Sequence, residues 1–152
     1  MKGESLMILL VEDNEDHAEI VKRSFKAHHV ANPIQHVTDG EAALDYLLRR
    51  GKYTDPKKSP RPHLILLDLR LPKIDGLDVL KEIKETDALR RIPVVVLTSS
   101  EEENDVAMAY DHYANSYLSK PLDFKKFTEL MRELGFYWLG WNINPYVQHT
   151  SG

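Results

Sequence analysis

Short apolar runs alternate with longer amphipathic stretches along this chain, and that alternation is typical of parallel α/β proteins. The apolar runs have strand length, and the stretches between them repeat their apolar residues at helical spacing, as Phe124, Phe127 and Leu130 do. The expected strands are Leu6–Val11, Pro33–Val37, Leu64–Leu67, Pro93–Leu97 and Ser116–Leu118. The expected helices are Glu15–His28, Glu41–Arg50, Leu77–Glu85, Glu101–His112 and Phe124–Leu134.

This order of elements predicts a doubly wound, five-stranded parallel sheet with five helices, because parallel neighbours need right-handed crossovers with helices on both faces. Strand order 2-1-3-4-5 is the most economical, and it places a crevice between the first and third strands. Gly51–Pro62 is a charged, proline-rich connection that is longer than usual. We expect it to be either a mobile surface loop or a recognition element.

Polar residues suited to phosphoryl chemistry stand where four of the expected strands end. Glu12 and Asp13 follow the first strand, and Asp68 follows the third. Thr98 follows the fourth strand, and Lys120 comes at the end of the fifth. The carboxyl ends of parallel strands share one edge of a sheet, so we expect these side chains to converge there.

Each of these residues also has an ordinary structural explanation. Capping of the next helix, worth about 1 kcal/mol, would account for one of Glu12, Asp13 and Asn14. Thr98 could begin a turn, and Lys120 could be a surface lysine. Capping does not explain why acids lie one strand away from Asp68, and a lysine beside three acids has an electrostatic reason to point inward.

Length and composition exclude several classes of protein. The 152 residues, 42% hydrophobic and 29% charged, fit one ordinary globular domain. A net charge of -4 indicates no nucleic-acid partner, and we interpret Lys57, Lys58 and Arg61 as part of a solvated loop. The absence of cysteine excludes disulfides and thiolate metal sites and suits a reducing cytoplasm. The first apolar run is too short for a signal peptide or membrane span, so we expect a soluble cytoplasmic protein without a membrane partner.

Four motifs, in order, resemble those of the receiver domain of two-component response regulators. They are Val-Glu-Asp-Asn at 11–14, Leu-Asp-Leu-Arg-Leu-Pro-Lys-Ile-Asp-Gly at 67–76, Val-Leu-Thr-Ser at 96–99 and Tyr-Leu-Ser-Lys-Pro at 117–121. The resemblance runs from Leu6 to about Leu134 and implies a flavodoxin-like receiver fold. It divides the chain into a receiver domain, 1–134, and an aromatic C-terminal extension, 135–152.

The resemblance also implies a role for each residue at the sheet edge. Asp68 matches the phosphoacceptor, Thr98 the switch hydroxyl, Lys120 the phosphate-binding lysine and Tyr117 the aromatic switch position. Glu12 and Asp13 match the acid pair that binds Mg²⁺, with Glu in place of the more usual Asp at the first position. We expect Asp13 and Asp68 to bind Mg²⁺ directly, together with the main-chain carbonyl of Arg70, and Glu12 to act through water.

The expected function is Mg²⁺-dependent acceptance of a phosphoryl group on Asp68 from a sensor histidine kinase. Such a chain is a signalling protein that assists its own phosphotransfer and dephosphorylation, not an enzyme with a separate substrate. The alternative is a degenerate receiver that docks without phosphorylation. A dehalogenase-like phosphatase would need a second Asp where Arg70 stands, and Glu12 and Asp13 would repel the phosphate of a flavin.

The segment after the last helix bears on the partners of the chain. Gly135–Tyr146 is too short for a DNA-binding domain and holds both tryptophans, so we expect the signal to pass to a downstream protein target or phosphotransfer protein. We also expect a symmetric homodimer through the fourth helix, fifth strand and fifth helix, with the aromatic extension contributing. The rival arrangement folds the extension onto its own domain. The extension and the long connection resemble small regulators associated with phytochrome-type sensor kinases.

Overall fold

A computed structural model of the chain describes residues 7–27, 34–98 and 116–119, together with Lys125 and Glu129. The predicted fourth helix and the aromatic extension lie outside the described residues. So does the predicted fifth helix, apart from Lys125 and Glu129, which are both helical.

The strands form a single parallel sheet in the order β2-β1-β3-β4-β5, which confirms the predicted topology. Register pairs Val11 of β1 with Leu67 of β3, and Asp68 of β3 with Leu97 of β4. Glu12, one residue beyond Val11, therefore lies level with Asp68 at the carboxyl edge. The strands are Ile8–Val11 (β1), Ile34–Val37 (β2), Leu64–Asp68 (β3), Val94–Thr98 (β4) and Ser116–Ser119 (β5).

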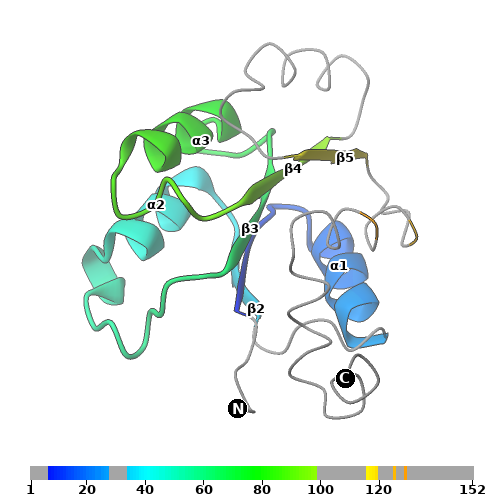
Figure 1. Cartoon of the computed structure of the whole chain (residues 1–152). Helices are drawn as coiled ribbons and strands as arrows, with labels where there is room; N and C mark the ends of the chain where they lie inside the picture. Colours follow the sequence, from blue (N-terminus) through cyan, green and yellow to red (C-terminus); the bar gives the residue numbers. More distant parts are fainter. Residues whose placement is uncertain (1–6, 28–33, 99–115, 120–124, 126–128, 130–152) are drawn as a thin grey trace, which may run out of the picture.

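Helices cover both faces of the sheet, as a parallel sheet requires. Helix α1 (Glu15–Ala27) lies on one face, and α2 (Gly40–Leu48) and α3 (Gly76–Glu85) lie on the other (Figure 1). Leu9 and Leu10 point to opposite faces of β1, and neither has any exposed surface. Each helix within the described part of the chain is too short or too polar to cross a bilayer.

The main described core lies between the sheet and the pair α2 and α3. Alternate residues of the central strands face these helices, because successive side chains of a strand point to opposite faces. The buried residues of this core include Leu9, Val11, Ile65, Leu67, Val94 and Val96 from the strands, and Tyr46, Leu47, Val79, Leu80 and Ile83 from the helices.

The long connection before β3 is held against α2. It begins with a short 3₁₀-helix, η1 (Gly51–Tyr53). The Tyr46 hydroxyl donates a 2.7 Å hydrogen bond to the carbonyl of Pro60, and the Arg61 guanidinium donates to the carbonyl of Leu47. Lys57 and Lys58 are exposed as predicted, but Arg61 is only half-exposed, so its assignment to a solvated loop was wrong. A guanidinium can satisfy a helix C-terminus, which composition alone does not show.

Candidate functional site

Three acidic side chains gather at the carboxyl edge of the sheet, between β1 and β3. One carboxylate oxygen from each of Glu12, Asp13 and Asp68 lies within 4.8 Å of the other two. Glu12 and Asp68 are 1% and 3% exposed, whereas Asp13 is exposed. Like charges this close repel one another, and a hard divalent cation with oxygen ligands relieves the repulsion. The predicted convergence of these three acids is confirmed.

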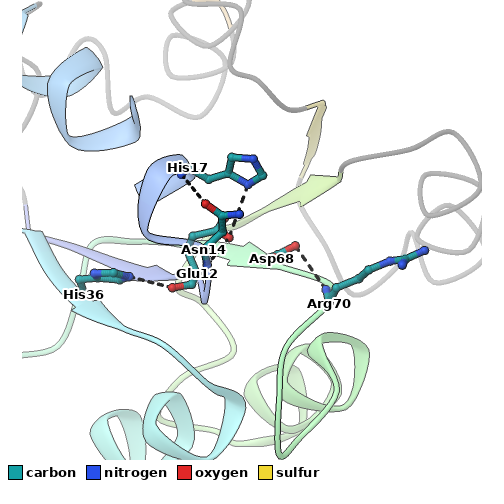
Figure 2. Close-up of polar contacts among 6 residues, drawn as sticks. All are labelled: Glu12, Asn14, His17, His36, Asp68 and Arg70. Carbon is teal, nitrogen blue, oxygen red and sulfur yellow. Dashed lines mark hydrogen bonds and ion pairs between the residues drawn. The ribbon is translucent and has the colours of Figure 1, made fainter. Parts of the chain in front are cut away.

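Glu12 is held from two sides (Figure 2). Its main-chain N–H donates to the carbonyl of Val37 over 3.0 Å, and its own carbonyl lies 2.8 Å from Nε2 of His36. Its side-chain Oε2 accepts a 3.1 Å hydrogen bond from the main-chain N–H of Asn14. The main chain of Glu12 is thus fixed to β2, while its carboxylate is fixed to the turn that leads into α1.

Asn14 begins α1, and this tests the capping explanation. Its Oδ1 accepts a 3.0 Å hydrogen bond from the main-chain N–H of His17, which is the bond of an N-cap residue. Capping therefore accounts for Asn14 and leaves the positions of Glu12 and Asp13 to be explained otherwise.

His17 is a site neighbour that the sequence analysis did not identify. Its Nδ1 lies 3.8 Å from Oε2 of Glu12, and its side chain is 37% exposed. The available signal was its place in the first turn of the helix that follows the acid pair. Two other histidines are structural: His63 lies within hydrogen-bond distance of the main chain of Met7, just before β1, and His36 within hydrogen-bond distance of the main chain of Glu12, just after it.

Asp68 is the last residue of β3, and the next segment turns back toward it. We call this segment the β3–α3 loop (Leu69–Asp75). The main-chain N–H of Arg70 donates to Oδ1 of Asp68 over 3.3 Å, while the exposed Arg70 side chain extends away from the carboxylate (Figure 2). At the far end of the loop, the Asp75 side chain caps α3 through the N–H of Leu77. It is the main chain of Arg70, not its guanidinium, that meets Asp68.

The other predicted site residues are placed only in part. Thr98 ends β4, one residue beyond Leu97, the partner of Asp68 in the register. Tyr117 lies in β5, paired with Val96. The side chains of Thr98 and Tyr117, and the whole of Lys120, lie outside what the structure describes, so their roles stay predictions.

Comparison with known proteins agrees with this fold and site. The family model for the response regulator receiver domain matches residues 8–132. The chain is 46% identical over 139 residues to the probable methanogenesis regulatory protein FilR2 of Methanothrix harundinacea (strain 6Ac), covering 91% of this chain and 87% of that protein.

Two solved structures show the same similarity in three dimensions. The bacteriophytochrome response regulator AtBRR has a TM-score of 0.80 and 42% identity, covering 89% of this chain and 96% of that one. The Mn²⁺-bound form of response regulator Rcp1, a protein known from Synechocystis sp., has a TM-score of 0.70 and 42% identity, covering 88% and 94%. The chain belongs to the response regulator receiver domain family, and it is a homologue of the phytochrome response regulators within two-component signalling.

Proposed function

We propose that Asp68 accepts a phosphoryl group from a sensor histidine kinase in a Mg²⁺-dependent reaction. The observation that carries this proposal is the buried Asp68 carboxylate beside those of Glu12 and Asp13 at the carboxyl edge of a receiver-family sheet. A buried acid among other acids is costly unless a cation joins them. Capping accounts for Asn14 but not for this cluster.

The acid cluster fits Mg²⁺, which prefers one or two carboxylates and several waters to an all-protein cage. Asp13 and Asp68 would bind the ion directly with the main-chain carbonyl of Arg70, and Glu12 would act through water. The relative Rcp1 has a Mn²⁺-bound form, which supports divalent-cation binding by this chain. When bound, the ion offsets the charge of the acids and of the incoming phosphoryl oxygens.

The proposed transfer uses Asp68 as the nucleophile. A carboxylate oxygen of Asp68 bonds to phosphorus, and the bond from phosphorus to the kinase histidine nitrogen breaks, leaving its electron pair on that nitrogen. Lys120 neutralises the phosphoryl oxygens, and Thr98 donates a hydrogen bond to one of them. Tyr117 then turns into the space that Thr98 vacates. Water then attacks the same phosphorus and the bond from phosphorus to the Asp68 oxygen breaks, which releases inorganic phosphate and the free carboxylate, so the chain assists its own dephosphorylation.

Mass spectrometry of the intact protein after incubation with acetyl phosphate tests this assignment. We expect one Mg²⁺-dependent phosphoryl group on the wild-type chain and none on Asp68→Asn. Asp75→Asn is the matched control, because Asp75 lies on the same loop and asparagine can also cap α3. Full labelling of Asp68→Asn would refute the assignment. A wild-type chain that stays unlabelled by acetyl phosphate and by kinases would favour the docking module that needs no phosphorylation.

We further infer that the phosphodonor is a phytochrome-type sensor kinase acting in the cytoplasm, where histidine kinases draw on ATP. The similarity to AtBRR over 89% of this chain supports this donor class. Transfer from an autophosphorylated phytochrome-type kinase should be faster than from an unrelated histidine kinase at equal concentration. Equal rates from the two kinases would contradict the inference. The signal would then pass to a downstream protein target or a phosphotransfer protein by contact.

A symmetric homodimer remains our proposal for the assembly. The aromatic extension concentrates apolar side chains, and an isologous interface would bury two such segments at once. The residues concerned are Phe136, Tyr137, Trp138, Leu139 and Trp141. Sedimentation equilibrium should show a dimer for the full chain and a folded monomer for a chain ending at Leu134. If the full chain is monomeric at high concentration, the dimer is excluded and the rival arrangement, an extension folded on its own domain, is supported.

A further inference from the structure

The β3–α3 loop rests against the first turn of α2, a helix that carries none of the predicted site residues. The main-chain N–H of Gly40 donates to the carbonyl of Pro72 over 3.2 Å. A β-carbon at Gly40 would lie 2.2 Å from the carbonyl oxygen of Ile74 and 2.8 Å from its β-carbon. Non-bonded atoms do not approach so closely, so the loop occupies this position because residue 40 has no side chain.

The other end of the same loop meets the Asp68 carboxylate. The Arg70 N–H donates to Oδ1 of Asp68 over 3.3 Å, only two residues before the carbonyl that Gly40 contacts. A tight turn follows, in which the N–H of Ile74 donates to the carbonyl of Pro72 over 2.8 Å. The loop is therefore short and fixed at both ends. A displacement at Gly40 must be taken up within a few residues of Asp68.

Charge makes a smaller contribution to this contact than the main chain does. The Lys73 ammonium lies 3.7 Å from Oδ2 of Asp39 and 3.6 Å from Oε1 of Glu41, on either side of Gly40. The Lys73 side chain is 59% exposed and lines a hollow of about 500 Å³ with these two acids, where solvent screens the pairs. Exposed ion pairs of this kind contribute little. The close approach of Gly40 to the loop is the larger determinant.

We propose that Gly40 is a positioning residue for the metal and phosphoacceptor site. Its contacts with Pro72 and Ile74 hold the β3–α3 loop where the main chain of Arg70 meets Asp68. The inference rests on the proposed function in taking Asp68 as a metal ligand. Coupling between two sites is reciprocal, so a contact that favours Mg²⁺ binding must itself be stabilised when Mg²⁺ binds.

Two glycine substitutions separate this role from a general loss of stability. In Gly40→Ala the new methyl group collides with the loop. In Gly51→Ala it makes only an ordinary contact, 3.8 Å from Oδ2 of Asp45, but the residue has a strained φ of +59°. Both variants should lose stability. Gly40→Ala should also weaken Mg²⁺ binding about tenfold, the low end of the losses in affinity seen when residues that support metal ligands are changed. Gly51→Ala should bind Mg²⁺ as the wild type does. Titration calorimetry measures the Mg²⁺ affinity of both variants. Wild-type affinity in Gly40→Ala, or an equal loss in Gly51→Ala, would overturn the proposal.

Hydrogen exchange on the full wild-type chain tests the same coupling without a substitution. Saturating Mg²⁺ should slow exchange of the Gly40 amide more than that of Ala43, whose N–H donates to Asp39 within the first turn of α2. Equal effects on the two amides would refute the coupling. Phosphorylation is measured separately. If the chain accepts no phosphoryl group but Mg²⁺ slows exchange at Gly40 as expected, only the proposed function is refuted. If the chain is phosphorylated but Mg²⁺ affects Gly40 and Ala43 equally, only this inference is refuted.

Discussion

The Nε2 atom of His36 lies 2.8 Å from the main-chain oxygen of Glu12. A carbonyl oxygen only accepts hydrogen bonds, so the proton must be on Nε2. The Glu12 N–H donates in turn to the carbonyl of Val37, in the same strand as His36, so β2 fixes the main chain just after β1, at the residue that precedes Asp13. A neighbouring strand thus sets where the acid pair begins.

His36→Phe should therefore weaken Mg²⁺ binding as well as destabilise the fold by about 1 kcal/mol, the usual cost of one hydrogen bond. His63→Phe is the matched control. Nδ1 of His63 accepts from the main-chain N–H of Met7, before the opposite end of β1, so its loss should cost similar stability and leave Mg²⁺ affinity unchanged. Urea unfolding and calorimetric titration measure the two effects. Unchanged Mg²⁺ affinity in His36→Phe would show that the contact is structural only.

Repulsion among the clustered carboxylates should lower the stability of the metal-free protein. Asp13→Asn should raise the unfolding free energy without Mg²⁺ by about 1 kcal/mol, the Coulomb energy of two like charges about 4 Å apart in water, which surrounds the exposed Asp13. The same variant should bind Mg²⁺ and accept phosphate less well, because a hard cation loses a charged ligand. Asp16→Asn is the control, since Asp16 lies in the first turn of α1, where an acid is favourable. A lower melting temperature for metal-free Asp13→Asn would show that another contact of Asp13 outweighs repulsion.

The acid cluster could be predicted from the sequence because it depends on two local patterns. Glu12 and Asp68 each follow an apolar run of strand length, and parallel register then brings the two strand ends together. The alternation of apolar runs and amphipathic stretches likewise predicted the strand order that the structure has. These inferences need only the direction of each strand and the shared edge of the sheet.

The contacts that support the site could not be predicted in the same way. The approach of Gly40 to Ile74 joins segments that are far apart in the sequence, and nothing in either segment alone indicates it. The same holds for His36 against Glu12, and for Arg61 against Leu47. Such contacts depend on side-chain rotamers and on the exact path of loops. A sequence pattern constrains neither, whereas it does constrain which face of an element is buried.

A left-handed residue at the end of α2 provides a test of backbone strain away from the site. Arg49 has φ +57° and ends the helix, a conformation that costs a residue with a side chain roughly 1 kcal/mol. Burial lowers the pKa of Arg61, and the neighbouring charge of Arg49 lowers it further, because the two guanidinium groups repel each other. Arg49→Gly should therefore stabilise the protein in urea unfolding and leave Mg²⁺ affinity unchanged. A loss of stability would show that the Arg49 side chain makes a packing contribution larger than both costs.

Tyr46 should give the fold a distinct dependence on alkaline pH. Burial raises the pKa of its phenol above the usual 10.0, an effect that Arg49 opposes and Tyr53 reinforces. The phenol is protonated in the fold, where it donates to the carbonyl of Pro60 over 2.7 Å. In the unfolded chain it ionises near pH 10.0. Its contribution is therefore fully present below that pH and is lost as the pH rises through the folded pKa.

Tyr46→Phe isolates this contribution, because it removes the hydroxyl and keeps the ring that packs edge-on against Tyr53 at 5.1 Å. At neutral pH the variant should be less stable than the wild type by about 1 kcal/mol, the net value of one hydrogen bond. The difference should shrink as the pH rises past 10.0, since only the wild type then releases a proton from this residue on unfolding. Urea unfolding of both proteins from neutral pH upward measures it. A difference that stays constant across that range would mean that the phenol ionises equally in the folded and unfolded chains.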